Sequence, residues 1–260
     1  MKAIDVSLLE VAAALVPVAI AVAISLRERA GVETDIGVAA ARAFVQLTAV
    51  GFVIKFIFDE DSLLFVFVLI GVMVLIATAT ARRRAARVPR AFAPLLAGIG
   101  LAAASTLALV VALGIFDPEA RYLVPVAGMV IGNAMTTAAV ALNRLGDEVG
   151  SSGREIEATL SLGATAAQAM RPILRRSLRS GLIPLIDQTK TTGLIAFPGV
   201  MVGMLLAGAE PVDAVRLQLI LLYTLLGAVS VSVLISMGLA YRSFFTADHQ
   251  LREAPGHSGA

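Results

Sequence analysis

Long apolar runs separated by short polar stretches dominate the pattern of this chain. Seven runs approach or exceed the roughly 20 residues that a helix needs to cross a hydrocarbon core about 30 Å thick. They cover about 6–26, 36–58, 63–81, 92–116, 123–142, 192–209 and 215–241. The runs lack the alternation that marks strands of a membrane β-barrel. The pattern predicts an all-α polytopic membrane protein with about seven transmembrane helices, in a single domain over 1–245 with a polar tail at 246–260.

Composition supports this class, since 58% of the residues are hydrophobic and 15% are charged, far from a typical soluble domain. The chain has no cysteine, which excludes disulfides, thiolate metal sites and cysteine nucleophiles. Its small net charge of +2 reflects basic loops of the kind that face the cytoplasm. We therefore expect a lipid bilayer around the chain and no nucleic-acid partner.

Basic residues predict the orientation of the chain, because Lys and Arg are enriched in cytoplasmic loops. They gather in the loops after the first, third and fifth runs and in the tail, whereas the other loops, 59–61, 117–121 and 210–213, are short and acidic. This predicts an outside N-terminus, an inside C-terminus and a cytoplasmic segment at 143–190. Whether 180–190 enters the membrane stays open, because Leu182-Ile-Pro-Leu-Ile186 is apolar.

The segment 143–190 carries helix signals. Ser152 and Glu155 fit a capping box. Gly163 and Pro172 are each expected to bend or divide the segment, which gives two short helices beneath the bundle instead of one long rod. One apolar stripe is predicted at helical spacing, formed by Ile156, Leu160, Gly163 or Ala164, Ala167, Met170 and Leu174. One interpretation is an interfacial amphipathic helix whose arginines rest on anionic lipid. The alternative is a segment that binds a cytosolic protein.

A family resemblance favours the second interpretation. Glu157-Ala158, then Gly163-Ala164 and a continuation through Pro172 resemble the EAA loop of ABC-transporter permeases, whose coupling helices dock into a cleft on the ATPase subunit. Further motifs accompany it in order along the chain: Arg42-x3-Gln46-Leu47, Gly128-Met-x-Ile-Gly132-Asn133-Ala-Met135, Ile183-Pro184-x2-Asp187-x2-Lys190-Thr191-x-Gly193 and Pro198-Gly199-x-Met201-x-Gly203. Together they resemble the Fet-type iron-export permeases, a bacterial family related to plant aluminium-tolerance permeases.

The resemblance implies a permease subunit that exports iron or a related metal species. It implies a homodimer in a bacterial inner or plasma membrane, with a separate cytosolic ABC ATPase that binds ATP and Mg. The chain itself has no G-x4-G-K-[ST] phosphate loop, so we expect it to bind no cofactor and not to be an enzyme. The alternatives are an ABC permease for another cargo, such as a nucleotide sugar, and a secondary transporter driven by an ion gradient. An intramembrane enzyme is disfavoured, because HExxH, GxSxG and paired membrane aspartates are lacking.

Charged residues inside apolar runs need an explanation, since each costs about 2.5–3.5 kcal/mol on insertion scales. Glu10 and Lys55 are expected at similar depths near the outer face, where they either share a wet cavity or snorkel separately. Arg42 and Gln46 are four residues apart and share one helix face. That face either lines a transport pathway or forms interhelical hydrogen bonds.

Further pathway candidates lie in the last three runs. Asn133 accompanies Gly128-x3-Gly132, a spacing that favours close helix packing, as does Gly199-x3-Gly203. Asp187, Gln188 and Lys190 are expected at the cytoplasmic mouth of the sixth span, where they either gate the pathway or form a solvated helix start. Pro198 and Gly199 fall within that span and are a candidate hinge.

The ligands of a transported metal cannot be assigned from the sequence. Met129, Met135, Met201 and Met204 offer thioethers, but methionine at helical spacing usually fills a core. His249 and His257 lie in the polar tail. Hard oxygen ligands such as Glu10 suit iron better.

Overall fold

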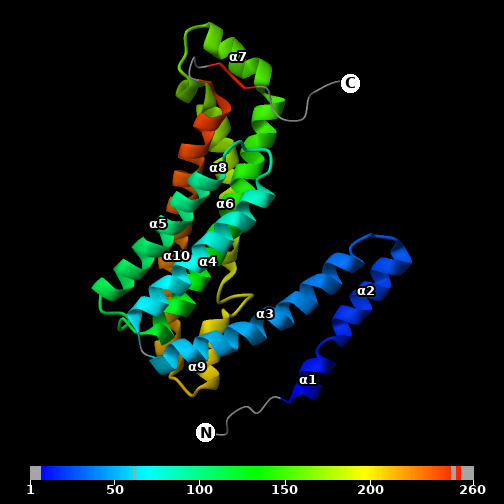
Figure 1. Ribbon diagram of the computed structural model, residues 1–260, viewed down its shortest axis with the longest axis vertical. Helices are drawn as coiled ribbons and strands as arrows, with labels where there is room; N and C mark the ends of the chain where they lie inside the picture. Colours follow the sequence, from blue (N-terminus) through cyan, green and yellow to red (C-terminus); the bar gives the residue numbers. More distant parts are fainter. Residues whose placement is uncertain (1–6, 61, 247–249, 253–260) are drawn as a thin grey trace. The chain divides into compact units, whose positions relative to one another are not determined.

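The computed structural model describes residues 7–60, 62–246 and 250–252. Its long elements are helices, as predicted (Figure 1). They are α1 (Leu8–Ala13), α2 (Val16–Glu28), α3 (Glu33–Glu60), α4 (Leu63–Arg84), α5 (Phe92–Ala112), α6 (Ala120–Ser151), α7 (Gly153–Ser161), α8 (Ala166–Thr191), α9 (Gly199–Leu206), α10 (Pro211–Ala240) and the 3₁₀-helix η1 (Tyr241–Phe244). The chain forms two compact units, Met1–Ser62 and Leu63–Ala260, and each is described by itself.

The smaller unit is a helical hairpin. The first apolar run is interrupted between α1 and α2, just before Pro17 near the start of α2. The turn from α2 to α3 is held by Ser25, whose Oγ donates to Glu33 at 2.7 Å and accepts from the Val32 amide at 3.4 Å. Because Arg29 takes the left-handed conformation that ends α2, the chain reverses over a few residues. No residue between Glu33 and Lys55 is buried.

The larger unit is a bundle arranged around α6 and α10. Helix α6 contacts α4, α5, α8 and α10, and α10 contacts α5, α6, α8 and α9. The fully buried side chains come mainly from these facing surfaces, with Leu95 and Ile99 on α5, Leu142 and Leu145 on α6, and Val229 on α10 among them. Because the apolar side chains pack between the long helices, the polar segments lie at the two ends of the bundle.

Helices α5 and α10 approach each other most closely at Gly98. A Cβ at this position would lie 2.5 Å from the Ser232 carbonyl oxygen and would also clash with the Ser236 hydroxyl. Both serine hydroxyls are buried, and so is the Thr106 hydroxyl farther along α5. None of the three has a hydrogen-bond partner in the described part of the chain.

Among the described residues, six helical stretches are long and apolar enough to cross a membrane. The predicted sixth span, 192–209, is not one of them. Residues 192–198 are irregular, and Gly193 (φ +86°) donates its amide to the Ala196 carbonyl. Only the 8 residues of α9 after them are helical. The predicted span, interrupted at Pro198-Gly199, is thus irregular over 192–198 and helical in α9, and the helix before it, α8, extends to Thr191.

The two ends of the larger unit, which Figure 1 shows at the top and bottom of the bundle, differ in their charged residues. The end that carries α7, the loop 85–91 and η1 is here called the Arg-rich end, since Arg82, Arg83 and Arg84 close α4 there. The opposite end carries the turns before α6 and α10 and is acidic, with Asp117, Glu119, Glu210 and Asp213. Helix α8 starts at the Arg-rich end and α10 starts at the acidic end, so α8 and α9 together bring the chain back between them.

Candidate coupling site and transport pathway

Helix α7 follows α6 with only Ser152 between them. The predicted capping box of Ser152 and Glu155 is wrong, since the Ser152 side chain makes no cap hydrogen bond. An N-cap needs an extended backbone, but Ser152 has φ −103° and ψ 15°. Its amide donates instead to the Glu148 carbonyl at 2.9 Å and so still belongs to the end of α6. The start of α7 is thereby coupled directly to α6.

The turn from α7 to α8 is closed at both sides. The Gly163 amide donates to the Leu160 carbonyl and the Ala164 amide to the Thr159 carbonyl, at 2.9 and 3.3 Å. This pair of bonds is a Schellman motif, which requires the positive φ of +86° at Gly163. A capping box of Thr165 and Gln168 then starts α8. The predicted division at Gly163 is confirmed.

The predicted division at Pro172 is wrong. Helix α8 has 26 residues and contains both Pro172 and Pro184, so the segment forms one short and one long helix. Its buried face differs from the predicted stripe and consists of Ala169, Met170, Ile173, Ser177, Gly181 and Leu185. A Cβ at Gly181 would lie 2.5 Å from the Ala141 Cβ of α6. Residues from Gly181 onward therefore run beside the apolar part of α6.

The α7–α8 turn exposes an apolar side chain beside an acidic one. Ile156 is buried and anchors α7 to the bundle, whereas Glu157, Ala158 and Gly163 are exposed. Leu162 is 89% exposed. Exposure of a large apolar side chain to water is unfavourable relative to its burial. The sequence analysis did not identify Leu162 as a candidate residue. A leucine directly before the glycine that ends a short helix was the pattern that could have indicated it.

Ion pairs brace this end of the bundle. Glu148 of α6, whose side chain is only 15% exposed, lies 3.0 Å from Arg144 and 3.2 Å from Arg176 of α8. Arg87 of the α4–α5 loop pairs with Asp147 of α6. Next to it the glycine at 146 allows close contact, since a Cβ there would lie 2.7 Å from the Arg87 Cβ. Helices α6 and α8 and the α4–α5 loop are thus tied together beneath α7.

The described part of the tail also contacts this region. Phe245 and Leu251 form an isolated antiparallel bridge, and the Arg252 side chain donates to the Phe245 carbonyl at 2.9 Å. A Leu251 side-chain carbon lies 3.8 Å from where a Cβ of Gly153 would be. The chain after η1 therefore packs beside the start of α7.

Asp187, Gln188 and Lys190 lie in the last turn of α8, not at a helix start. All three are exposed, and Asp187 lies 3.8 Å from Lys190. They are followed by the irregular residues 192–198. The candidate hinge residues Pro198 and Gly199 are the N-cap and the first residue of α9, so the break in this path precedes them.

The charged residues that the sequence singled out in the smaller unit do not pair with one another. The Glu10 carboxylate accepts from the Ser7 amide at 2.7 Å in a capping box that starts α1. It forms no ion pair with Lys55 within residues 7–60. Arg42 and Gln46 lie on α3 and are both exposed. The structure therefore does not bring Glu10 and Lys55 together.

Asn133 bonds within its own helix, because its Nδ2 donates to the Met129 carbonyl at 2.8 Å. Of the glycines predicted to pack closely, Gly128 would place a Cβ 3.3 Å from the Met73 side chain of α4. The other predicted glycines, Gly132, Gly199 and Gly203, have open space at this position. Close packing is confirmed at Gly128 only.

Among residues 7–60, 62–246 and 250–252, no three His, Asp or Glu side chains gather as they would around a metal. Met129 and Met135 lie on α6, Met201 and Met204 on α9. His249 and His257 fall outside the described residues. The ligands of a metal cargo thus stay unassigned.

Comparison with known proteins places this arrangement in a family. A family model described as an uncharacterised protein family, UPF0014, matches residues 8–245. The chain belongs to the UPF0014 family. A UPF0014 membrane protein of Oryza sativa subsp. japonica, STAR2, is 43% identical over 96% of this chain and 87% of its own.

Two further UPF0014 relatives carry informative names. The probable iron export permease protein FetB of Escherichia coli K12 is 36% identical over 92% of this chain and 93% of its own. The protein ALUMINUM SENSITIVE 3 of Arabidopsis thaliana is 38% identical over 93% and 88%. No solved structure matches. The resemblance to Fet-type permeases is confirmed, and the chain is a multi-pass membrane protein of a permease family.

Proposed function

We propose that this chain is the permease subunit of an ATP-driven exporter of iron or a related metal species, and that a separate cytosolic ATPase docks on the α7–α8 turn. The observation that carries the docking site is Leu162, an almost fully exposed apolar side chain at the tip of a rigid turn. Buried apolar anchors dominate the energetics of protein interfaces. Glu157 and Ala158 lie on the exposed surface of the same short helix.

The bracing of α7 supports the transmission of movement. A docked ATPase would push on a turn fixed by the Schellman motif and the Thr165 capping box. Helix α8 starts at this turn and is about 39 Å long by helix rise. It ends at the irregular residues 192–198, so a shift at α7 displaces that break.

The break is our candidate for the moving part of the pathway. Irregular backbone at membrane depth is tolerated where it is buried in protein or lines a water-filled cavity, and broken helices form the substrate sites of many transporters. Asp187, Gln188 and Lys190 precede the break, and Pro198 and Gly199 follow it as the hinge. Arg42, Gln46 and Asn133 remain further pathway candidates, and so does Glu10.

The homodimer is proposed on the family resemblance. Arg42 and Gln46 lie one helical turn apart on α3, and an arginine that faces lipid is costly. We therefore expect this face of α3 to lie against protein in the assembly. In this assembly two permease chains and two ATPase subunits, which bind ATP and Mg, sit at a bacterial inner or plasma membrane.

The cargo proposal rests on the relatives. The Escherichia coli protein is named for iron export, and the plant protein for aluminium sensitivity. We take a metal species as the class of cargo, since one name states iron export and the other refers to a metal. The chain's acidic side chains suit such hard cations better than its methionines do.

Vesicles that contain the permease and the ATPase that co-purifies with it test the proposal. With the wild-type chain we expect ATP-dependent efflux of loaded iron. Leu162→Ser and Glu157→Lys are expected to weaken co-purification of the ATPase roughly tenfold or more and to stop efflux, while the chain still inserts. Glu155→Lys is the matched control, since it reverses an exposed charge on the same helix.

The outcomes separate the parts of the proposal. Full co-purification and efflux in both Leu162→Ser and Glu157→Lys would remove the docking site. ATP-driven transport of another solute without iron movement would overturn the cargo. Transport that needs an ion gradient and no ATPase would identify a secondary transporter.

A further inference from the structure

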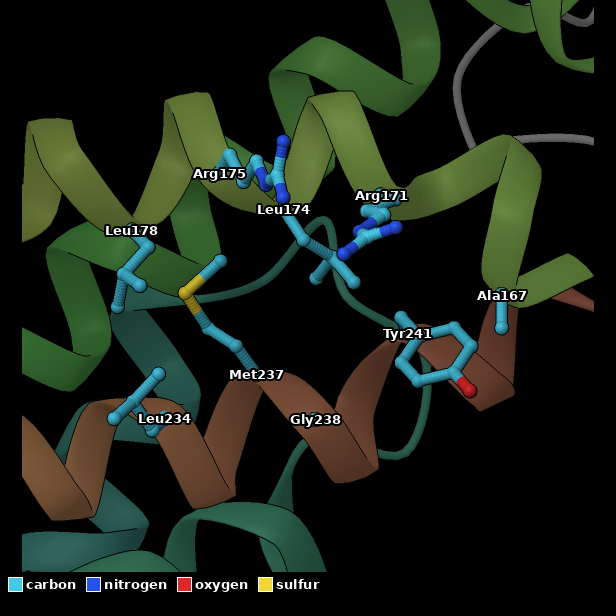
Figure 2. Close-up of a pocket in the computed structure, with 9 residues that line it drawn as sticks. All are labelled: Ala167, Arg171, Leu174, Arg175, Leu178, Leu234, Met237, Gly238 and Tyr241. Atoms are coloured by element: carbon cyan, nitrogen blue, oxygen red, sulfur yellow. The ribbon is translucent and has the colours of Figure 1, made fainter.

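The larger unit has a groove between α8 and α10 that none of the coupling or pathway residues lines (Figure 2). Its volume is about 280 Å³, just below the roughly 300–1,000 Å³ of sites that enclose whole small molecules. Leu174 and Leu178 form the α8 wall, and Leu234 and Met237 form the α10 wall. The groove suits one elongated apolar group.

Gly238 keeps the groove open. A Cβ at this position would meet no atom within 4 Å, and its φ is not positive. The glycine is therefore not required by backbone geometry or by close packing. Its missing side chain leaves room between Met237 and Tyr241, where any larger residue would fill the groove.

The groove is basic at its rim. Arg171 and Arg175 line it on α8, and neither forms an ion pair with any residue that the structure describes. The lining includes no carboxylate. By contrast Arg176, which is not part of the lining, pairs with Glu148 at 3.2 Å. The two guanidinium groups are exposed at the rim and free to bind an anion.

The order of residues along the groove matches a lipid leaflet. Helices α8 and α10 run in opposite directions, so Ala167 and Tyr241 lie toward the Arg-rich end and Leu178 and Leu234 lie deeper (Figure 2). The 11 residues from Ala167 to Leu178 rise about 16 Å, more than the roughly 5–8 Å headgroup layer of one leaflet. Tyrosine is enriched at this interface. With the Arg-rich end at a membrane surface, Arg171 and Tyr241 would lie at headgroup depth and Leu178 and Leu234 in hydrocarbon, with Arg175 between them.

We propose that this groove binds one anionic phospholipid of the leaflet at the Arg-rich end, with its phosphate on Arg171 and Arg175 and an acyl chain between α8 and α10. Basic pockets between transmembrane helices on the cytoplasmic side commonly hold anionic headgroups. A second copy of the chain fits less well, because it would have to bring carboxylates to the arginines. A free phosphate would leave the apolar walls unused. The bound lipid would bridge α8 and α10.

Native mass spectrometry of the full-length chain tests this, with phosphatidylglycerol and phosphatidylcholine of identical acyl chains as probes. We expect selective retention of one phosphatidylglycerol. The double variant Arg171→Gln with Arg175→Gln should weaken retention roughly thirtyfold. This is the attraction of about 1 kcal/mol per arginine to an anionic lipid, summed over two arginines and converted to a ratio of binding constants. Arg82→Gln with Arg83→Gln removes the same charge from the exposed end of α4 and should leave retention unchanged.

The apolar part of the groove is tested separately. Gly238→Leu should abolish retention, and Gly238→Ala should reduce it by less. Gly227→Leu is the matched control, because Gly227 is on the same helix and also has open space for a Cβ. Thermal unfolding of each variant verifies that it is folded.

Three results would overturn the proposal. They are equal retention of both lipids, unchanged retention in the double arginine variant, and unchanged retention in Gly238→Leu. Displacement of the lipid by millimolar inorganic phosphate alone would identify a free-anion site instead.

Discussion

Three glycines set how closely the helices of the larger unit approach one another. A Cβ at Gly98 would lie 2.5 Å from a backbone oxygen of α10, one at Gly146 2.7 Å from Arg87, and one at Gly181 2.5 Å from Ala141. Real Cβ atoms do not tolerate such distances, so a larger residue forces the helices apart. Gly98 is the most restrictive of the three, because its nearest backbone atom would lie at 2.5 Å, against 3.3 Å for Gly146 and 3.0 Å for Gly181.

Gly98→Ala should lower the free energy of unfolding by about 1–3 kcal/mol, the usual cost of overpacking a well-packed core. Thermal unfolding of the purified chain in detergent measures the effect. Gly100→Ala on the same helix is the control, since its Cβ would lie 3.8 Å from the nearest atom, Val74 Cγ1. Ser236→Ala should not rescue Gly98→Ala, because the Ser232 carbonyl remains. Equal melting temperatures for the two glycine variants would contradict the close contact.

At the scale of elements, α8 is the helix through which the proposed coupling would act. It begins in a capped turn at the Arg-rich end, packs closely on α6 at Gly181, and ends before the break at 192–198. At Gly181 and Ala141 both side chains are small, so the two helix backbones lie close together there. A movement of α7 would be transmitted along α8 only if this contact stays intact.

Gly181→Ala should separate α8 from α6 and lower stability by about 1–3 kcal/mol. Ala141→Gly should largely restore it, since it removes the Cβ that the new methyl group would meet. Melting temperatures of the two single variants and the double variant form a cycle. Additive effects, with no rescue, would show that positions 141 and 181 are not in contact.

The sequence predicted the apolar helices well, because a run of about 20 apolar residues has few alternatives. It predicted α8 poorly. Pro172 suggested a bend or break, but α8 continues through it and through Pro184. Four arginines suggested a surface helix. The buried face was still present as small and apolar residues four apart, Ala169, Ile173, Ser177, Gly181 and Leu185. Spacing alone did not say which of two possible stripes faces α6, and the rejected one, with Ala167 and Leu174, lines the groove instead.

The candidate site was predictable in part. Gly163 was recognised because a glycine after a short helix usually ends it. The cap was misplaced, since Ser152 and Thr165 both precede a suitable Glu or Gln and only backbone conformation distinguishes them. Close packing at Gly98 and Gly181 was not foreseen. A glycine at such a contact depends on a partner helix far away in the chain.

For the whole molecule, the distribution of charge makes sidedness testable. The Arg-rich end carries α7, and the acidic end carries the turns before α6 and α10. Positive loops mark the cytoplasmic side, so the larger unit should place Leu162 inside and Asp117 and Asp213 outside. Helices α8 and α9 must then complete one crossing between them.

Single cysteines can test this without background, because the chain has none of its own. Leu162→Cys and Arg83→Cys should react with a membrane-impermeant maleimide only after the cells are opened. Asp117→Cys and Asp213→Cys should react in intact cells, because the acidic end faces outward. Labelling of Asp213→Cys from the same side as Leu162→Cys would show that α8 and α9 do not cross together.

Thr106 of α5 and Ser232 and Ser236 of α10 carry buried hydroxyls without a hydrogen-bond partner in the described residues. A serine or threonine on a helix can rotate its hydroxyl to donate to the carbonyl four residues earlier. These hydroxyls can therefore exchange partners without disturbing the backbone hydrogen bonds of either helix. The contact at Gly98 differs in this respect from a purely apolar one, because polar groups are available there to pair differently when α10 shifts against α5.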